Sequence, residues 1–360
     1  MAETWGSLSE TLVRESIRRR IPISGAFELT SRCNLQCKMC YICQPAREQN
    51  IINKERTAKE WIKLAGEARD AGMLFLLLTG GEVFIRKDFK EIYEELSNMG
   101  FNINIYTNAT LITPQITKWL GRLQPSKISI TLYGASPETY QKVCGFADGY
   151  KRAVNGIDML LAEGIVVGLR TTVVMGNAVE FDDLAELADA RGIDLGIVNY
   201  IAPRREAGCT DPVGNRLSPG DLVEYEEHVQ EYNVRTNKQV ITDNSTKPGE
   251  NRIIEGQADA YRCKAGKCEF WVGWDGGMHP CGTFNEPVAR PFETGFLKAW
   301  EDLGKLCKLV PICEPCQECS IQNYCIKCPA RHMLETGCYD KPAPYLCELA
   351  KNRAEKKIII

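Results

Sequence analysis

Short apolar runs alternate with longer amphipathic segments over the first two hundred residues. The apolar runs are rich in Ile, Val, Leu and Phe, as is typical of parallel strands covered on both faces. They span residues 24–30, 73–79, 101–107, 127–132, 165–174 and 194–200. Because amphipathic stretches separate them, the pattern predicts repeated βα units around a parallel sheet.

The amphipathic segments carry apolar residues three and four positions apart, which indicates helices. The clearest lie at 56–70, 87–98, 114–120 and 150–162. Gly72, Gly100 and Gly164 are expected to end three of the helices. Six such units fall short of the eight that close a TIM barrel, so we expect a partial, open (β/α)6 TIM-like barrel in an α/β protein.

Four regions follow from this pattern. We expect a helical N-terminal extension over 1–21 and the partial barrel over 22–205. A connector over 206–260 contains one helical stretch near 221–235, and a small cysteine-rich module occupies 261–360.

Composition and charge narrow the class of protein. With 44% hydrophobic and 25% charged residues, the 360-residue chain can bury one large core and a smaller module. No apolar stretch predicts a membrane span or a secretory signal, so a cytoplasmic location is expected. A net charge of −3 gives no reason to expect nucleic acid binding. In a reducing compartment, seventeen cysteines indicate metal ligands rather than disulfides.

The first cysteine group is Cys33, Cys37 and Cys40, spaced Cys-x-x-x-Cys-x-x-Cys. Thiolates are the usual ligands of iron–sulfur clusters, and three of them leave one iron of a 4Fe-4S cluster open to another ligand. A zinc knuckle is the alternative. It would need a fourth ligand, and the nearest extra cysteine, Cys43, is too close for an ordinary tetrahedral site.

This motif resembles the S-adenosylmethionine (SAM) site of the radical SAM enzymes. The resemblance implies that the open iron binds the amino and carboxylate groups of SAM, which is cleaved to methionine and a 5′-deoxyadenosyl radical. Gly80-Gly81-Glu82 follows the second predicted strand and resembles the GGE motif of the family, which holds the SAM amino group. An ordinary tight turn after a buried strand is the alternative for this tripeptide.

The family supplies its other SAM contacts by strand position. Small polar groups and arginines stand where those contacts are expected, namely Thr107, Asn108, Ser129, Thr131, Arg152 and Arg170. Either arginine could bind the SAM carboxylate in a bidentate fork. Arg170 is favoured because it lies within an apolar strand, whereas Arg152 fits a solvated helix face equally well.

The C-terminal cysteines form a second motif, which resembles the SPASM extension of radical SAM peptide and protein maturases. The resemblance assigns one auxiliary 4Fe-4S cluster to Cys263, Cys268, Cys281 and Cys328, and another to Cys316, Cys319, Cys325 and Cys347. The spacing between Cys325 and Cys328 is one residue shorter than is usual in the family. A pair of zinc sites is the alternative, and a shift of register that makes Cys313 a ligand stays open.

Fully ligated auxiliary clusters would accept an electron after hydrogen abstraction, so the resemblance implies a net oxidation. Its expected substrate is a peptide, oxidised for example by thioether or carbon–carbon crosslinking. Formylglycine formation is disfavoured, because Gly282 stands where one sulfatase-maturing subgroup has an Asp. Asp275 and His279 are candidate proton acceptors, although a structural role is favoured for each.

Partners and alternatives follow from the same reasoning. Only 32 residues precede Cys33, so a separate leader-recognition protein is one expectation for a peptide substrate. Flavodoxin or ferredoxin is the expected reductant. The other candidates are a radical dehydrogenase or carbon-skeleton enzyme acting on a small molecule, and a non-catalytic metal-binding electron carrier, which the GGE tripeptide disfavours.

Overall fold

The computed structural model describes residues 5–42, 44–205, 210–238, 240–242 and 260–359. Cys43, Cys209 and residues 243–259 of the expected connector lie outside the described residues. The six predicted strands are confirmed and form consecutive parallel neighbours in one sheet. They are β1 (Ser24–Glu28), β4 (Phe75–Thr79), β5 (Asn102–Thr107), β6 (Lys127–Thr131), β7 (Val167–Thr172) and β8 (Leu195–Val198).

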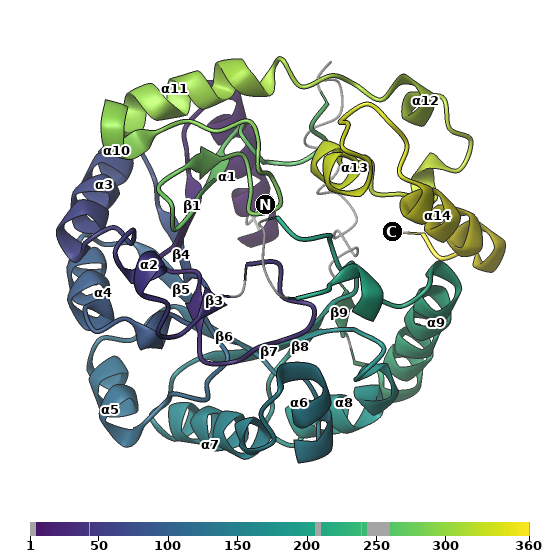
Figure 1. The fold of residues 1–360 in the computed structure, drawn as a ribbon, viewed down its shortest axis with the longest axis horizontal. Helices are drawn as coiled ribbons and strands as arrows, with labels where there is room; N and C mark the ends of the chain where they lie inside the picture. The colour runs from purple at the N-terminus through teal and green to yellow at the C-terminus, as the bar shows by residue number, and fades with distance from the viewer. Residues whose placement is uncertain (1–4, 43, 206–209, 239, 243–259, 360) are drawn as a thin grey trace.

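Helices cover the outer side of this curved sheet and complete the partial barrel (Figure 1). They are α3 (Ala58–Asp70), α4 (Phe89–Asn98), α5 (Pro114–Arg122), α6 (Pro137–Cys144), α7 (Asp148–Ala162) and α8 (Phe181–Asp189). Local sequence sets their ends: Thr57 and Glu60 form a capping box at the start of α3. Gly72, Gly100 and Gly164 adopt positive φ just after their helices, as predicted.

The sheet has more strands than the sequence pattern predicts. Three further short strands bring the number of strands to nine among the described residues. β10 (Glu269–Val272) pairs in parallel with β1, and β11 (Met278–His279) pairs antiparallel with β10. β9 (Ile241–Thr242) joins the other edge beside β8. The cysteine-rich region therefore continues the barrel sheet.

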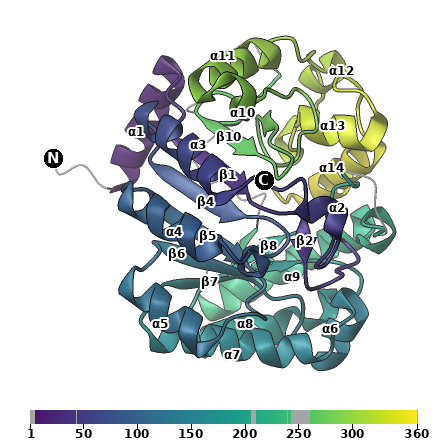
Figure 2. The same ribbon diagram turned by 60° about the vertical axis from the view of Figure 1, so that its left-hand side comes forward.

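The remaining elements pack around this extended sheet. Figure 2 shows β10 and the C-terminal helices lying together beside β1 and α1. α1 (Trp5–Arg19) confirms the expected N-terminal helix, and α9 (Pro219–Thr236) the expected helix of the connector. The others are β2 (Arg32–Cys33), β3 (Gln44–Pro45), α2 (Gln49–Ile52), α10 (Pro291–Thr294), α11 (Phe296–Cys307), α12 (Glu314–Gln317), α13 (Pro329–Thr336) and α14 (Pro344–Lys356), with 3-10 turns at Val83–Ile85, Ala178–Glu180, Val213–Asn215 and Gln322–Tyr324.

One hydrophobic core runs through both the barrel and the C-terminal region. The Phe27 ring of β1 lies 5.1 Å from the Trp61 ring of α3, and the Phe270 ring of β10 lies 5.1 Å from the Phe296 ring of α11. Such ring pairs add to the stabilisation from buried apolar area. No described helix is both long and apolar enough to cross a membrane.

Candidate active site and metal centres

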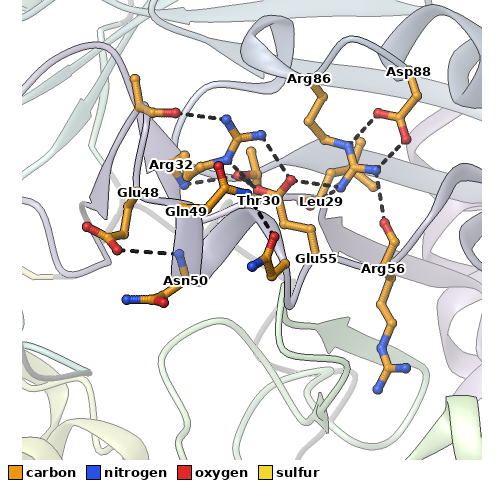
Figure 3. A network of polar contacts seen from close by, with 12 residues as sticks. Leu29, Thr30, Arg32, Glu48, Gln49, Asn50, Glu55, Arg56, Arg86 and Asp88 are labelled. Carbon is orange, nitrogen blue, oxygen red and sulfur yellow. Dashed lines mark hydrogen bonds and ion pairs between the residues drawn. The ribbon is translucent and has the colours of Figure 1, made fainter.

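A buried ion-pair network fixes the chain directly before the first cysteine (Figure 3). The Arg32 guanidinium donates Nε to Glu55 Oε1 at 2.8 Å and Nη2 to Glu55 Oε2 at 2.9 Å, and Nη1 donates to the Ala46 carbonyl at 2.8 Å. Thr30 also donates its hydroxyl to Glu55. Planar fork-to-fork pairing of this kind restrains orientation as well as distance, so it fixes the direction in which the chain enters the cysteine loop.

A second arginine joins this network to the end of the second barrel unit. Arg86 pairs with both carboxylate oxygens of Asp88 at 2.9 and 2.7 Å. Its remaining donors reach the Leu29 and Arg56 carbonyls at 2.8 and 2.9 Å (Figure 3). Its side chain is almost fully buried. The ends of β1 and β4 are thus held together beside the cysteine loop.

The three cysteines of the loop lie near enough to affect one another electrostatically. Burial, followed by the charges of Cys37, Glu82 and Cys40, raises the pKa of Cys33. The Cys33 sulfur accepts the Leu35 N–H at 3.4 Å and the Asn108 side-chain amide at 3.7 Å. Mutually repelling thiolates with nearby N–H donors suit an iron–sulfur cluster, which neutralises their charge. The residues therefore fit the group that the sequence motif predicts.

A fourth thiol lies beside this loop. A hydrogen bond with Cys144, followed by burial, raises the pKa of Cys37. The Cys144 carbonyl also accepts the Gln36 N–H at 3.2 Å, and the Lys38 N–H reaches the Val143 carbonyl at 3.0 Å. The end of α6 therefore supports the middle of the loop.

The Gly-Gly turn packs against the backbone that precedes the first cysteine. The Gly81 N–H donates to the Thr30 carbonyl at 2.8 Å, and the Glu82 N–H donates to the Arg32 carbonyl at 2.9 Å. A Cβ at Gly80 would lie 2.4 Å from the Thr30 oxygen, and one at Gly81 would lie 2.3 Å from the Arg32 oxygen. The glycines therefore permit a close approach of two chain segments.

Glu82 points inward and is fully buried. Its carboxylate accepts the Thr107 hydroxyl at 2.8 and 3.0 Å, the Asn108 N–H at 2.8 Å and the Phe84 N–H at 3.1 Å. Burial raises its pKa to about 7, and these hydrogen bonds act in the opposite direction. The side chain thus links β4 to β5 and presents Asn108 to the Cys33 sulfur.

Polar side chains line the concave face of the sheet beyond this turn. Ser129 donates to Asn104 at 3.2 Å, and Arg170 donates to the Tyr106 hydroxyl and lies over the Tyr106 ring. Tyr106 pairs with Ser129 in the strand register, and Thr131 pairs with Arg170. The structure therefore brings the three predicted residues Ser129, Thr131 and Arg170 together.

Arg152 is a predicted SAM contact that the structure places elsewhere. It lies on the surface of α7, where its Nε donates to Asp148 at 2.5 Å and its guanidinium lies 5.3 Å from the centre of the Phe146 ring. Both partners in the ion pair are half exposed. This is the solvated helix face that the sequence left open, and we leave Arg152 out of the proposed site.

A polar cluster joins the three-cysteine loop to the C-terminal region. Fully buried Glu28, at the end of β1, pairs with Arg205 at 2.7 Å and accepts the Trp271 indole N–H at 3.1 Å. Arg205 also donates to the Gly282 carbonyl at 3.1 Å and lies 5.5 Å from the centre of the Tyr41 ring. Since Tyr41 directly follows the loop and Gly282 follows Cys281, this cluster separates the two thiol groups.

The first C-terminal thiol set is brought together only in part. The pKa of Cys263 is raised to about 12, first by burial and then by the Cys328 and Cys281 thiolates. The pKa of Cys281 is also raised to about 12, first by burial and then by the Cys328 thiolate. Cys268 lies apart from this group. Its fully buried thiol packs against Ile17 and other apolar residues of the N-terminal region.

The cysteines of the second C-terminal set affect one another electrostatically. The pKa of Cys316 is raised to about 12. Burial is the largest cause, followed by a hydrogen bond with Cys313 and by the charges of Cys347 and Cys325. Burial and then the charges of Cys347 and Cys319 act on Cys325 in the same direction. These effects connect all four predicted ligands, which stay a prediction, and Cys313 is a fifth thiol that acts on Cys316.

Cys313 also contributes to a second arrangement. The ligating atoms of Cys313, Cys316 and His332 lie within 4.8 Å of one another. His332 Nδ1 lies 3.1 Å from the Tyr339 carbonyl, which can only accept, so Nδ1 carries the proton and Nε2 keeps its lone pair. Two candidate sets of metal ligands therefore share Cys316. One is the set of four predicted cysteines, and the other is Cys313, Cys316 and His332.

Sequence reasoning missed Glu55 and the Glu28–Arg205 pair. Their partners lie between 23 and 177 residues away in the chain, so no local motif connects them. One signal was present for Glu28, because a carboxylate inside an otherwise apolar strand requires a compensating partner.

Comparison with known proteins agrees with this geometry. Residues 27–190 match the Radical SAM superfamily. The chain is 27% identical over 340 residues to an AdoMet-dependent heme synthase from Methanosarcina barkeri, covering 89% of this chain and 95% of the relative. Among solved structures, SuiB from Streptococcus suis superposes with a TM-score of 0.70 at 17% identity, over 96% of this chain and 83% of SuiB. Native anSMEcpe with bound AdoMet gives a TM-score of 0.70 at 16% identity, over 92% of this chain and 96% of that structure.

The fold of these two structures confirms the partial barrel with its cysteine-rich C-terminal region. The matched segment contains the three-cysteine loop and the Gly-Gly-Glu turn, so residues 27–190 form a radical SAM domain, and a cysteine-rich C-terminal region follows it.

Proposed function

We propose that this chain is an oxidative radical SAM enzyme with three 4Fe-4S clusters that modifies a peptide. The observation that carries the oxidative part is the presence of separate thiol groups on the two sides of the Glu28–Arg205 cluster. One group leaves a coordination position open, whereas the group of Cys316, Cys319, Cys325 and Cys347 supplies four thiols.

In this proposal Cys33, Cys37 and Cys40 hold the first cluster, and the concave face of the sheet binds SAM. When bound, the cluster and SAM together supply a one-electron cleavage that yields methionine and a 5′-deoxyadenosyl radical able to remove a hydrogen atom from the substrate. The Gly80-Gly81 backbone and Asn108 lie beside the loop and orient the ligand.

The neighbouring polar residues complete this surface. Arg170, supported by Tyr106, offers a guanidinium to a carboxylate, and Ser129 and Thr131 offer hydroxyl groups. Glu82 acts as a positioning residue, because its carboxylate oxygens already accept hydrogen bonds from the ends of β4 and β5.

A substrate that has lost a hydrogen atom must also lose an electron and a proton to become a closed-shell product. The C-terminal thiols are the part of the described chain that suits an electron-accepting metal centre. SAM is then consumed as a co-substrate, and flavodoxin or ferredoxin supplies the first electron. The product lacks a pair of hydrogen atoms for each modification.

One observation supports a peptide substrate. SuiB has also been solved bound to its precursor peptide SuiA, and its fold matches 96% of this chain. A separate leader-recognition protein is compatible with this proposal.

A second candidate is a heme-forming enzyme that acts on a tetrapyrrole. It is favoured by the match to the Methanosarcina barkeri heme synthase, which extends over 95% of that relative. A tetrapyrrole that carries carboxylates would also find a guanidinium in Arg170.

Metal content tests the cluster part of the proposal. Anaerobically reconstituted protein should hold about twelve iron and twelve sulfide ions per chain, and Ala at Cys33, Cys37 and Cys40 together should remove about a third of them. Stoichiometric zinc with only one cluster would contradict two auxiliary clusters.

Product analysis tests the reaction and the substrate. With dithionite and SAM, the wild type should form 5′-deoxyadenosine, and Cys37→Ala should not. A peptide encoded beside the gene should lose a pair of hydrogen atoms by mass spectrometry with the wild type, and keep them with Cys347→Ala. Tight hemin binding with a shifted Soret band, together with an unmodified peptide, would favour the heme-forming candidate.

A further inference from the structure

Three side chains close a ring of hydrogen bonds beside the first cysteine of the loop. Asn34, which directly follows Cys33, donates its Nδ2 to the Thr110 hydroxyl at 2.7 Å. The Thr110 hydroxyl donates to Asn108 Oδ1 at 2.6 Å, and Asn108 Nδ2 donates to Asn34 Oδ1 at 3.1 Å. Each member of the ring therefore donates to the next, and hydrogen bonds in such a chain polarise and strengthen one another.

The ring determines which way the Asn108 amide points. Its Oδ1 also accepts the Thr110 N–H at 3.0 Å, and two donors from one residue identify this atom as the oxygen. The amide nitrogen donates one proton to Asn34 and the other to the Cys33 sulfur, at 3.7 Å. The Asn108 backbone N–H is held as well, by the Glu82 carboxylate at 2.8 Å. An N–H donor is thus fixed on the sulfur.

These hydrogen bonds are shielded from water. Asn108 and Thr110 are each only 5% exposed, so solvent does not take the place of a lost partner. The Cys33 sulfur also accepts the Leu35 N–H at 3.4 Å, but the course of the loop backbone sets that donor. The Asn108 amide is the donor to this sulfur that depends on side chains.

An N–H donor on a ligand sulfur affects how readily an iron–sulfur cluster accepts an electron. Hydrogen bonds to the sulfurs are among the factors that set the reduction potential of such a cluster. Reduction adds negative charge, and a hydrogen bond strengthens as its acceptor becomes more negative. The donor therefore favours the reduced cluster and raises the potential.

We propose that Asn34 and Thr110 are positioning residues, which raise the reduction potential of the first cluster by fixing the Asn108 side chain. Through that side chain they hold an N–H donor on the Cys33 sulfur. In the step concerned, one electron passes from the reductant to the cluster, and no bond forms or breaks. The inference rests on the proposed function only in placing a 4Fe-4S cluster at the three-cysteine loop.

The test is a redox titration of the reconstituted chain with dithionite and a low-potential viologen, followed by electron paramagnetic resonance. Because SAM is proposed to bind the open iron, the signal that changes on addition of SAM belongs to the first cluster. Thr110→Val removes the hydroxyl and keeps the shape, Thr110→Ser keeps the hydroxyl, and Asn34→Ala removes another member of the ring. Thr117→Val is the matched control, because Thr117 is a buried threonine of α5 whose hydroxyl donates to the Pro114 carbonyl at 3.2 Å. Iron content and far-UV circular dichroism check that each variant is loaded and folded.

We expect Thr110→Val and Asn34→Ala each to make reduction of the first cluster about tenfold less favourable, because the donor to the sulfur is weakened. Tenfold corresponds to a midpoint potential about 59 mV more negative for one electron. Thr110→Ser and Thr117→Val should keep the potential of the parent. Equal potentials in Thr110→Val, Asn34→Ala and Thr117→Val would overturn the inference. Loss of the first cluster from both ring variants would overturn it too, because the ring would then build the loop rather than adjust its potential.

Failure of the proposed function would give a different result. If no signal of the parent protein responds to SAM, the SAM-binding cluster is contradicted, and the inference about its potential falls with it. If the parent responds to SAM but the ring variants keep its potential, only the inference about Asn34 and Thr110 is overturned.

Discussion

Removal of the Glu55 carboxylate is the sharpest test of how the cysteine loop is held in place. In Glu55→Ala, the Arg32 guanidinium loses both of its carboxylate contacts, at 2.8 and 2.9 Å, and keeps only the Ala46 carbonyl. The Arg32 side chain is only 10% exposed, so water cannot replace the lost partner. Arg86 is affected less, because its pairing with Asp88 and with two carbonyls remains.

The expected loss in the free energy of unfolding follows from this difference between Arg32 and Arg86. Removing one member of a buried ion pair costs about 3–5 kcal/mol, because the other charge stays buried without compensation. We expect about 3 kcal/mol for Glu55→Ala, since Arg32 keeps one acceptor and Arg86 keeps its own partners. The double variant Arg32→Ala/Glu55→Ala should lose less stability than the two single variants lose together, because neither charge is then left buried without its partner.

The assay is urea unfolding of the metal-free chain, with iron uptake measured in parallel. Glu15→Ala is the matched control, because it removes a glutamate whose partner Arg18 is largely exposed, and it should change the midpoint little. The urea midpoint of Glu55→Gln should lie between those of Glu55→Ala and Glu15→Ala, since glutamine keeps the size of the side chain and one acceptor oxygen. If Glu55→Ala unfolds at the same urea concentration as Glu15→Ala, the network does not stabilise the loop as argued.

Three further predictions test other parts of the structure. Gly81→Ala should lower stability by about 1–3 kcal/mol and reduce iron uptake at the loop, because its Cβ would meet a backbone oxygen at 2.3 Å, whereas Gly66→Ala in α3 has open space and should be tolerated. Glu226→Ala should cost about 3–5 kcal/mol in urea unfolding, because it strands the buried Arg353 of α14, and an unchanged midpoint would contradict this. Cys313→Ser should keep the full iron content if the four-thiol assignment of its neighbours holds; loss of a cluster would show instead that Cys313 is a ligand.

The barrel was predictable because its signals are local. Strand runs, amphipathic spacing and helix-ending glycines such as Gly72 depend on neighbouring residues, and the structure confirms them. β10 was not predictable by the same route. Its four residues Glu-Phe-Trp-Val are too few for a periodic signal, and their pairing partner lies at the other end of the chain.

The site shows the same division. The three-cysteine loop and the Gly-Gly turn could be predicted because spacing along the chain determines which groups meet. Arg152 and Cys268 could not be judged in this way, because the face of a helix or strand on which a residue lies depends on packing. The Glu28–Arg205 pair joins residues 177 positions apart, and composition alone cannot bring them together.

The pairing of β10 with β1 also affects the order in which the chain can fold. Ser24 pairs with Glu269, so about 245 residues separate the two strands in sequence. Closing a loop of that length costs about 5 kcal/mol in chain entropy. At about 5–20 residues per second, β1 leaves the ribosome roughly 10–50 s before its neighbour is made. During that interval one edge of the barrel presents unpaired backbone groups, which are a template for aggregation. The strand that joins the two regions of the enzyme is therefore also the one whose absence leaves the nascent barrel most exposed to misassembly.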